Sequence, residues 1–317
     1  MSGNPDAGPP PKAAVSGVRV GVGLLVAVVT VLVVLLDGLL GTKDSFRSSA
    51  PGTGLLLALL SAAAVRELCA MLAAAGVETL PGYASGATFV LLATRALAPA
   101  LGVRPGDAAA LAEAGLLLAV LGPVAARIAL RPKPEEGKPV ELPNAADLRP
   151  VAGTAFALLF VHVPMALLLE LRLATAVAGM AGPVPAGLVL ATMAAVTCKV
   201  GDSAAYFVGK TVGRRPLCWV SPKKTWEGAV AGTLVGTAAA AALGASFSLP
   251  LRNGLAFGLV VNLAGQGGDL LESWLKRCCG LKDSGATFGE MGGALDVVDS
   301  LLLAGPAGYL FHRIVLS

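Results

Sequence analysis

The last third of the chain carries acidic and basic side chains at helical spacing inside apolar stretches. They recur at positions i, i+3, i+4 and i+7, which places them on one face of a helix. The first such face consists of Lys199, Asp202, Ser203 and Tyr206. Two later stretches repeat the pattern with Asp269, Glu272, Ser273 and Lys276, and then with Asp296, Asp299 and Ser300. Three apolar helices are therefore predicted to carry a stripe of carboxylates.

These carboxylates need compensation in an apolar setting. Burying an ionised carboxylate in hydrocarbon is so costly that such groups persist only when they are paired, bound to metal or facing a wet cavity. Pairing with Lys199, Lys276 and Arg277 alone would make the acids purely structural. The acids outnumber these basic neighbours, and clustered carboxylate oxygens are the ligands that Mg²⁺ prefers. The pattern favours a metal-binding cluster over a set of structural ion pairs.

Two basic loops follow the first two acidic stripes. The first contains Ser221, Lys223, Lys224 and Thr225, directly before an expected helix. Backbone amides and the positive end of the helix dipole attract a polyanion at such a position, and the lysines neutralise it. The loop lacks the G-x-x-x-x-G-K-[ST] pattern of a P-loop. The second loop contains Arg277, Lys282 and Asp283.

Composition places these residues in a membrane protein. Of the 317 residues, 55% are hydrophobic and only 14% are charged, whereas a soluble domain carries about a quarter charged residues. Disordered, disulfide-built and coiled-coil chains are excluded on the same grounds. The net charge of +4 gives no reason to expect a nucleic-acid partner. Five cysteines without a C-x-x-C pair, together with only two histidines, make a zinc site unexpected.

Apolar runs predict an all-α, polytopic membrane helical bundle with about nine transmembrane helices. The runs are residues 18–40, 54–75, 83–101, 108–130, 151–171, 181–200, 229–249, 254–275 and 292–315. Residues 1–17 are rich in Pro, Gly and Ala and are predicted to be a flexible cytoplasmic tail. We expect residues 18–180 to form N-terminal transmembrane helices and residues 181–317 to form a C-terminal catalytic transmembrane region with cytoplasmic loops. Charged residues of the earlier spans, such as Glu67 and Arg95, are explained by helix ends and intramembrane pairing.

Orientation follows from the loop lysines and arginines. With nine spans, one side of the membrane holds fourteen of them and the other holds six. The positive-inside rule then places the N-terminus and the two most basic loops in the cytoplasm. Acids that suit a metal ion, next to basic loops at a cytoplasmic membrane face, predict phosphoryl or nucleotidyl transfer to a lipid.

The last third of the chain resembles the phosphatidate cytidylyltransferases, also called CDP-diacylglycerol synthases. The family signature runs Ser-x-x-Lys-Arg, four residues, Lys-Asp, and then a Gly-Gly pair before Asp-Arg-x-Asp. This chain matches it with Ser273, Lys276, Arg277, Lys282, Asp283, Gly292, Gly293, Asp296 and Asp299. The upstream blocks at residues 202–209 and 221–228 also look like those of the family.

The resemblance implies the reaction of CTP with phosphatidic acid, which gives CDP-diacylglycerol and pyrophosphate in phospholipid biosynthesis. It implies Mg²⁺ as the cofactor, with a second cation left open. It implies a multi-pass enzyme of the cell (inner) membrane whose partners are CTP, phosphatidic acid and membrane lipids. Whether the protein forms a homodimer is left open.

Site residues can be assigned on this basis. Asp269, Asp296 and Asp299 would bind the metal ion, with Asp202 and Glu272 as additional or supporting ligands. The residues expected to hold the CTP phosphates are Ser221, Lys223, Lys224 and Thr225. The cations expected closest to the transferred group and the leaving pyrophosphate are Lys276, Arg277 and Lys282. Asp202, Ser273 and Asp283 complete the expected substrate-binding set.

Two positions depart from the family pattern. Met291 replaces a histidine before the glycine pair, and Val297 replaces an arginine after the first signature aspartate. We still expect activity, because every acid of the motif is kept and the cations Lys276, Arg277 and Lys282 are available. A non-catalytic relative that binds nucleotide or lipid is the alternative that these departures raise.

Two further functions match the sequence less well. An ion-coupled transporter would use intramembrane acids, but it would carry discontinuous helices in two repeated halves, and no repeat is visible. A CDP-alcohol phosphotransferase would need an Asp-Gly-x-x-Ala-Arg core, which the sequence lacks.

Overall fold

A computed structural model of the chain describes residues 32–33, 37, 50–129, 144–175, 177, 180, 184–289 and 292–316. Within these residues the protein is built from helices, and the only β-type pairing is an isolated bridge between Pro216 and Thr225. The predicted all-α bundle is confirmed. The predicted tail at residues 1–17 lies outside the described residues, as does nearly all of the first predicted span.

The N-terminal helices begin and end at residues that favour helix boundaries. Pro51 and Pro81 occupy the first turns of α3 and α4, where a missing N–H costs nothing. Asn144 caps α6 by accepting a hydrogen bond from the backbone N–H of Ala146 at 2.8 Å. The elements are α3 (Pro51–Ala74), α4 (Pro81–Leu97), the 3₁₀ turn η1 (Ala98–Leu101), α5 (Pro105–Ala129), α6 (Ala145–Ala157), the π-helical turn η2 (Leu158–His162) and α7 (Val163–Arg172).

The C-terminal helices carry the predicted site. Thr225 caps α9 by accepting a hydrogen bond from Gly228 N at 3.2 Å. The elements are α8 (Ala186–Val212), α9 (Trp226–Ser246), α10 (Leu251–Cys278), α11 (Ala294–Val298), α12 (Leu301–Phe311) and the π-helical turn η4 (His312–Leu316). Helix α8 starts later and ends later than the predicted span 181–200. Asp202 therefore lies inside a continuous helix and not at its end.

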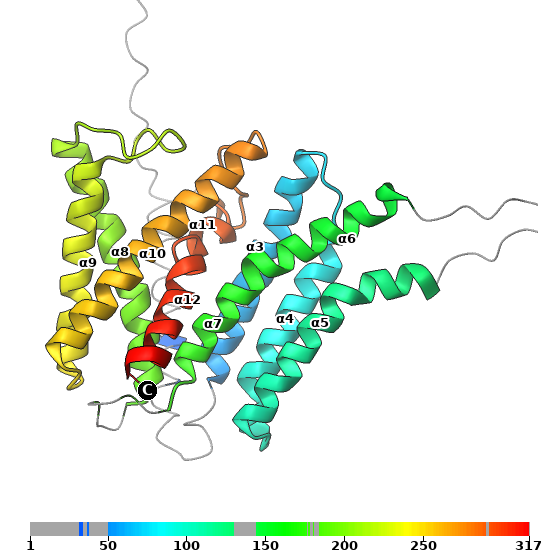
Figure 1. Cartoon of the computed structure of the whole chain (residues 1–317), viewed down its shortest axis with the longest axis horizontal. Coiled ribbons are helices and arrows are strands. Elements are labelled where there is room, and N and C mark those ends of the chain that lie inside the picture. The colour runs from blue at the N-terminus through cyan, green and yellow to red at the C-terminus, as the bar shows by residue number, and fades with distance from the viewer. Residues whose placement is uncertain are drawn as a thin grey trace, which may run out of the picture.

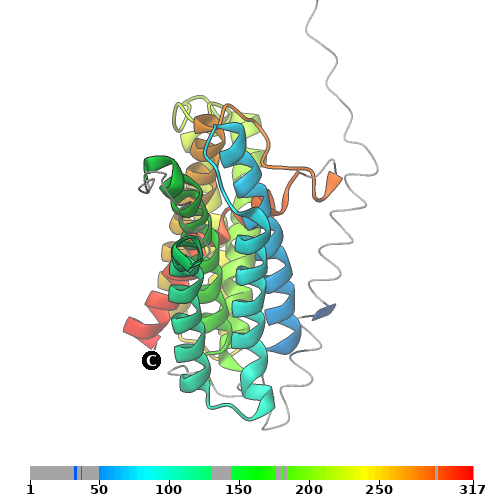
Figure 2. The ribbon, with the colours of Figure 1, turned by 90° about the vertical axis from the view of Figure 1, so that its right-hand side faces the viewer.

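The long helices stand side by side in a bundle that is broad in one view and narrow in the other (Figures 1 and 2). Helices α8, α9 and α10 pack together at one side, and α3, α4 and α5 pack at the other. Helices α7 and α12 contact each other between these groups, and α11 contacts α3. The loop between α8 and α9 and the C-terminal end of α10 lie at the same end of the bundle (Figure 1). Both basic loops therefore emerge there.

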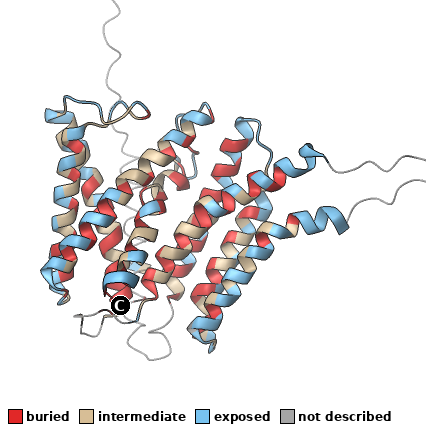
Figure 3. Cartoon of the chain, viewed as in Figure 1, coloured by how far each residue is buried: buried red, intermediate tan, exposed pale blue. Residues whose placement is uncertain are grey.

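The surface of the bundle is apolar along much of its length, which suits lipid contact. Exposed large side chains include Leu59, Leu118, Leu234 and Leu263, and buried residues line the helix contacts (Figure 3). Seven helical segments of the described residues are long and apolar enough to cross a membrane. Helix α10 has 28 residues and is more polar than these seven, because it carries the middle acidic stripe. The protein is thus a multi-pass membrane protein, and the predicted count of nine is approximate.

Helices α8, α9 and α10 approach one another at glycines. A methyl group at Gly236 would lie 2.3 Å from Asn262 Nδ2 and 2.7 Å from Thr197 O, so only glycine fits there. A methyl group at Gly201 would meet the same Asn262 amide at 2.3 Å. Asn262 Nδ2 donates to Thr197 O at 3.1 Å. Close backbone contact and one buried amide thus fix the relative positions of the helices that carry Asp202 and Asp269.

Candidate active site

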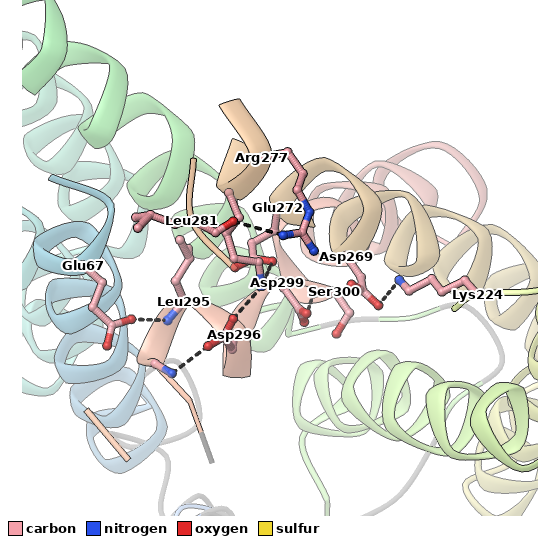
Figure 4. Close-up of polar contacts among 12 residues, drawn as sticks. Glu67, Lys224, Asp269, Glu272, Arg277, Leu281, Leu295, Asp296, Asp299 and Ser300 are labelled. Carbon is pink, nitrogen blue, oxygen red and sulfur yellow. Dashed lines mark hydrogen bonds and ion pairs between the residues drawn. The ribbon is translucent and has the colours of Figure 1, made fainter. Parts of the chain in front are cut away.

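Three carboxylates from different elements of the C-terminal half interact with one another. Asp202 comes from α8, Asp269 comes from α10, and Asp299 directly follows α11. Each interacts electrostatically with at least one of the others, and Lys199 and Lys224 are the cations that act on the group. Lys224 Nζ forms an ion pair with Asp269 Oδ2 (Figure 4). The first basic loop is therefore joined directly to the acidic cluster.

A second polar cluster lies two turns further along α10. Lys276 Nζ is 2.6 Å from Glu272 Oε2 and 2.8 Å from Asp296 Oδ1, so one ammonium group bridges two carboxylates. Glu272 is fully buried, with an exposed side-chain fraction of 0%. The other oxygen of Asp296, Oδ2, accepts a hydrogen bond from Gly293 N at 2.7 Å (Figure 4). Both oxygens of Asp296 are thereby occupied.

The predicted metal ligands fall into these two clusters, which are linked because Glu272 of the second interacts electrostatically with Asp299 of the first. Asp269 and Lys276 are seven residues apart on one helix, which separates them by about 10 Å along its axis. Asp296 contacts Lys276, whereas Asp299 interacts with Asp269. Among the residues that the structure describes, no three His, Cys, Asp or Glu side chains are grouped closely enough to hold a metal ion. Asp202, Asp269 and Asp299 offer the carboxylate oxygen donors that Mg²⁺ prefers, and Lys199 and Lys224 are the cations that act on them.

The first basic loop is held in one conformation by its backbone. Leu217 N donates to Lys224 O at 2.7 Å, and Trp226 N donates to Arg215 O at 3.0 Å. Glu227 Oε2 accepts hydrogen bonds from the backbone N–H groups of Arg214 and Arg215, at 3.1 and 3.3 Å. This folded loop presents the four predicted phosphate-binding residues near the N-terminus of α9: Ser221, Lys223, Lys224 and Thr225. Of the two lysines, Lys223 is exposed and Lys224 turns inward to Asp269.

The remaining predicted site residues lie at the C-terminal end of α10 and in the loop after it. Arg277 Nη1 donates to Leu281 O at 3.2 Å, which closes the turn after the helix (Figure 4). Lys282 and Asp283 are exposed in that loop, and Ser273 is half-buried on α10. Among the described residues, none of these side chains forms a hydrogen bond or an ion pair with Lys224. Met291 lies outside the described residues.

Two contributions were missed by sequence reasoning. Lys199 Nζ donates to Val297 O at 3.2 Å and to Ser300 Oγ at 3.4 Å, so a cation contacts the backbone of the residue that replaces the family's arginine. Only its place on the same helical face as Asp202 could have suggested this. Glu67 of α3 accepts hydrogen bonds from Thr287 Oγ1 and from Leu295 N, the latter at 2.9 Å. No local pattern marks Glu67, because its partners lie more than 200 residues away.

Comparison with known proteins decides the family. The model of the cytidylyltransferase family matches residues 17–315, nearly the whole chain. The chain belongs to the cytidylyltransferase family. The match includes the N-terminal spans, which show no motif of their own in the sequence. The predicted resemblance is confirmed.

Relatives within this family are named phosphatidate cytidylyltransferases. The chain is 44% identical over 115 residues to phosphatidate cytidylyltransferase 5, chloroplastic, of Arabidopsis thaliana, covering 36% of this chain and 29% of the relative. It is 40% identical over 115 residues to the enzyme of Brucella suis (36% and 43%). It is 37% identical over 135 residues to that of Synechocystis (42% and 46%). The matched segments thus span less than half the length of each of these relatives.

Proposed function

We propose that this protein is a CTP:phosphatidate cytidylyltransferase. It would transfer the cytidylyl group of CTP to phosphatidic acid, giving CDP-diacylglycerol and pyrophosphate. The observation that carries the proposal is the ion pair between Lys224 and Asp269, which joins a basic loop to a carboxylate cluster. Family membership and the names of the relatives support the same reaction.

The chemistry needs positioning and charge neutralisation more than covalent catalysis. A phosphate oxygen of phosphatidic acid attacks the α-phosphorus of CTP in line, and the bond from that phosphorus to the β-phosphate oxygen breaks. Pyrophosphate leaves on the opposite side. Lys223 and Lys224 would bind the phosphates of CTP, and the exposed Lys282 would meet the lipid phosphate or the pyrophosphate. Lys276 holds Glu272 and Asp296 in place beside them.

We propose Mg²⁺ as the cofactor, with Asp202, Asp269 and Asp299 as the residues that would hold it. When bound, the ion supplies Lewis-acid stabilisation of the phosphate oxygens. Asp296, which the sequence predicts as a metal ligand, stays a prediction in that role. Its competitor is a structural role, because both of its oxygens already have partners in this structure.

The test is a transfer assay on purified protein with CTP labelled in the cytidine and with phosphatidic acid. Label should move into a lipid product, in an amount equal to the pyrophosphate released. Diacylglycerol, which lacks the attacking phosphate, is the control acceptor and should stay unlabelled. Nucleotide binding without transfer would favour a non-catalytic relative. Proton or sodium uptake into vesicles without transfer would favour a transporter.

We further propose that the protein lies in the cell (inner) membrane with the loop between α8 and α9 in the cytoplasm, where CTP is. A cysteine introduced at Thr211, after replacement of the native cysteines, reports the side. An impermeant thiol reagent should label it only after the membrane is opened. Labelling from outside intact cells would contradict both the orientation and the access to CTP.

A further inference from the structure

Glu67 is a buried carboxylate of an N-terminal helix that contacts the C-terminal signature segment. Its exposed fraction is 8%, and it sits on the side of α3 that faces α11. Among the ion pairs of the described residues none involves Glu67. Its partners are the hydroxyl of Thr287 and the backbone N–H of Leu295, each contacting a different carboxylate oxygen (Figure 4 shows the second).

The chain leaves room for this carboxylate at two glycines. A methyl group at Gly293 would lie 2.3 Å from Glu67 Oε2, and one at Gly285 would lie 2.5 Å from Oε1. Any larger residue at either position would displace the carboxylate. The segment around Glu67 is therefore shaped to receive its side chain.

Leu295 is the second residue of α11, whose preceding residue Gly293 has no side chain to cap the helix. The first N–H groups of a helix need acceptors from elsewhere. Glu67 supplies one from another helix, and Asp296 supplies a second by accepting from Gly293 N. The same Asp296 binds Lys276 through its other oxygen. A continuous chain of contacts thus runs from Glu67 through the first turn of α11 to Lys276.

We propose that Glu67 is a positioning residue that fixes Thr287 and the first turn of α11, and thereby holds Asp296 and Lys276 in contact with each other. The expected effect of Glu67 on turnover rests on the proposed function. Its expected effect on the order of Thr287 and the first turn of α11 does not depend on that function.

The first experiment measures hydrogen–deuterium exchange in the full-length protein in detergent. Glu67→Ala removes both acceptors, so amides of the peptide from Ser284 to Val298 should exchange faster, while those of α9 should not. Glu67→Gln should restore most of the protection, because its amide oxygen can accept from Leu295 N and its NH₂ group can donate to the Thr287 hydroxyl. Glu170→Ala, which removes a half-buried carboxylate elsewhere, is the control for general loosening.

The second experiment separates kcat from KM. Because the loop proposed to bind CTP lies between α8 and α9, Glu67→Ala should lower kcat on the order of 100-fold and change the KM for CTP by less than about twofold. Glu67→Gln should retain most of kcat. The exposed Glu113→Ala should equal the native protein in both measurements.

The exchange of the peptide from Ser284 to Val298 decides whether Glu67 has a positioning role. Native exchange of the Ser284–Val298 peptide in Glu67→Ala would overturn the proposal, and so would a uniform rise equal to that of Glu170→Ala. If Glu67→Ala fails to fold, Thr287→Val decides, because it removes one hydrogen bond and should still speed exchange in this peptide alone. If the native protein transfers no cytidylyl group, the proposed function fails, and the exchange result still decides the role of Glu67.

Discussion

The two halves of the bundle differ in how they hold charge. In the N-terminal half, Arg95 and Glu170 form a closed pair, with Nε donating to Oε1 and Nη2 donating to Oε2 at 2.7 Å. Both oxygens of Glu170 are thereby bound by one guanidinium group, whose third nitrogen, Arg95 Nη1, is buried without a hydrogen-bond partner among the described residues. Charge in this pair is balanced one to one. In the C-terminal half, Lys276 is shared by two acids, and Asp202, Asp269 and Asp299 interact electrostatically with one another and with Lys199 and Lys224. A group in which the numbers of acidic and basic side chains differ is suited to bind a phosphate or a cation.

The largest effect on turnover is expected at Asp269, in the C-terminal half. Asp269→Asn keeps the shape and removes the charge, so turnover should fall roughly 1,000-fold while the protein still folds. Chelation of divalent cations should abolish native activity, and added Mg²⁺ should restore it. The measurement is the rate at saturating CTP, normalised to folded protein. Near-native turnover would mean that Asp269 has only a structural role, as the partner of Lys224.

A smaller effect is expected at the partner of Asp269. Lys224→Ala removes a cation from the CTP phosphates and leaves the Asp269 charge unpaired. We expect kcat/KM for CTP to fall on the order of 100-fold. Lys210→Ala, in a nearby exposed position, is the matched control and should stay within about twofold. Equal effects of the two variants would mean that general positive charge, and not this contact, matters.

The departures from the family motif should matter less still. Lys282→Ala should lower turnover by about tenfold, and Met291→His should raise it by less than that. Lys199 already places a cation beside Val297 O, so Val297→Arg should add little. An inactive native protein that gains activity from Met291→His with Val297→Arg would identify a non-catalytic relative.

The N-terminal pair should affect stability without affecting chemistry. Glu170→Gln leaves Arg95 buried without its counter-charge, which should cost about 3 kcal/mol of folding free energy. The turnover of the fraction that remains folded should be native. Thermal unfolding in detergent and activity per folded molecule give the two numbers. A fall in kcat of the folded fraction would contradict the expectation that charged pairs of the N-terminal half affect only stability.

The helices could be predicted from the sequence because apolar runs of membrane length leave few alternatives. The faces of α8 and α10 also followed from spacing. The grouping of acids across helices did not, because spacing alone does not say which turn of α10 faces which neighbour. The sequence predicts Asp296 beside Asp269, whereas the structure shows it bound to Lys276, which lies two turns after Asp269 on α10. In the sequence, Glu67 looks like an ordinary charged residue of a span. Its role could not be predicted there, because its partners come from the far end of the chain.

The glycine contacts of α8, α9 and α10 have a mechanical consequence. Because Gly201 and Gly236 have no room even for a methyl group, these helices cannot slide or roll past one another without breaking contact. A bilayer changes in thickness and lateral pressure around the protein. Under such loads this three-helix unit should move as one stiff body and pass deformation to its loops and to α7 and α12. The spacing between Asp202 and Asp269 is thereby insulated from the state of the membrane that supplies the lipid.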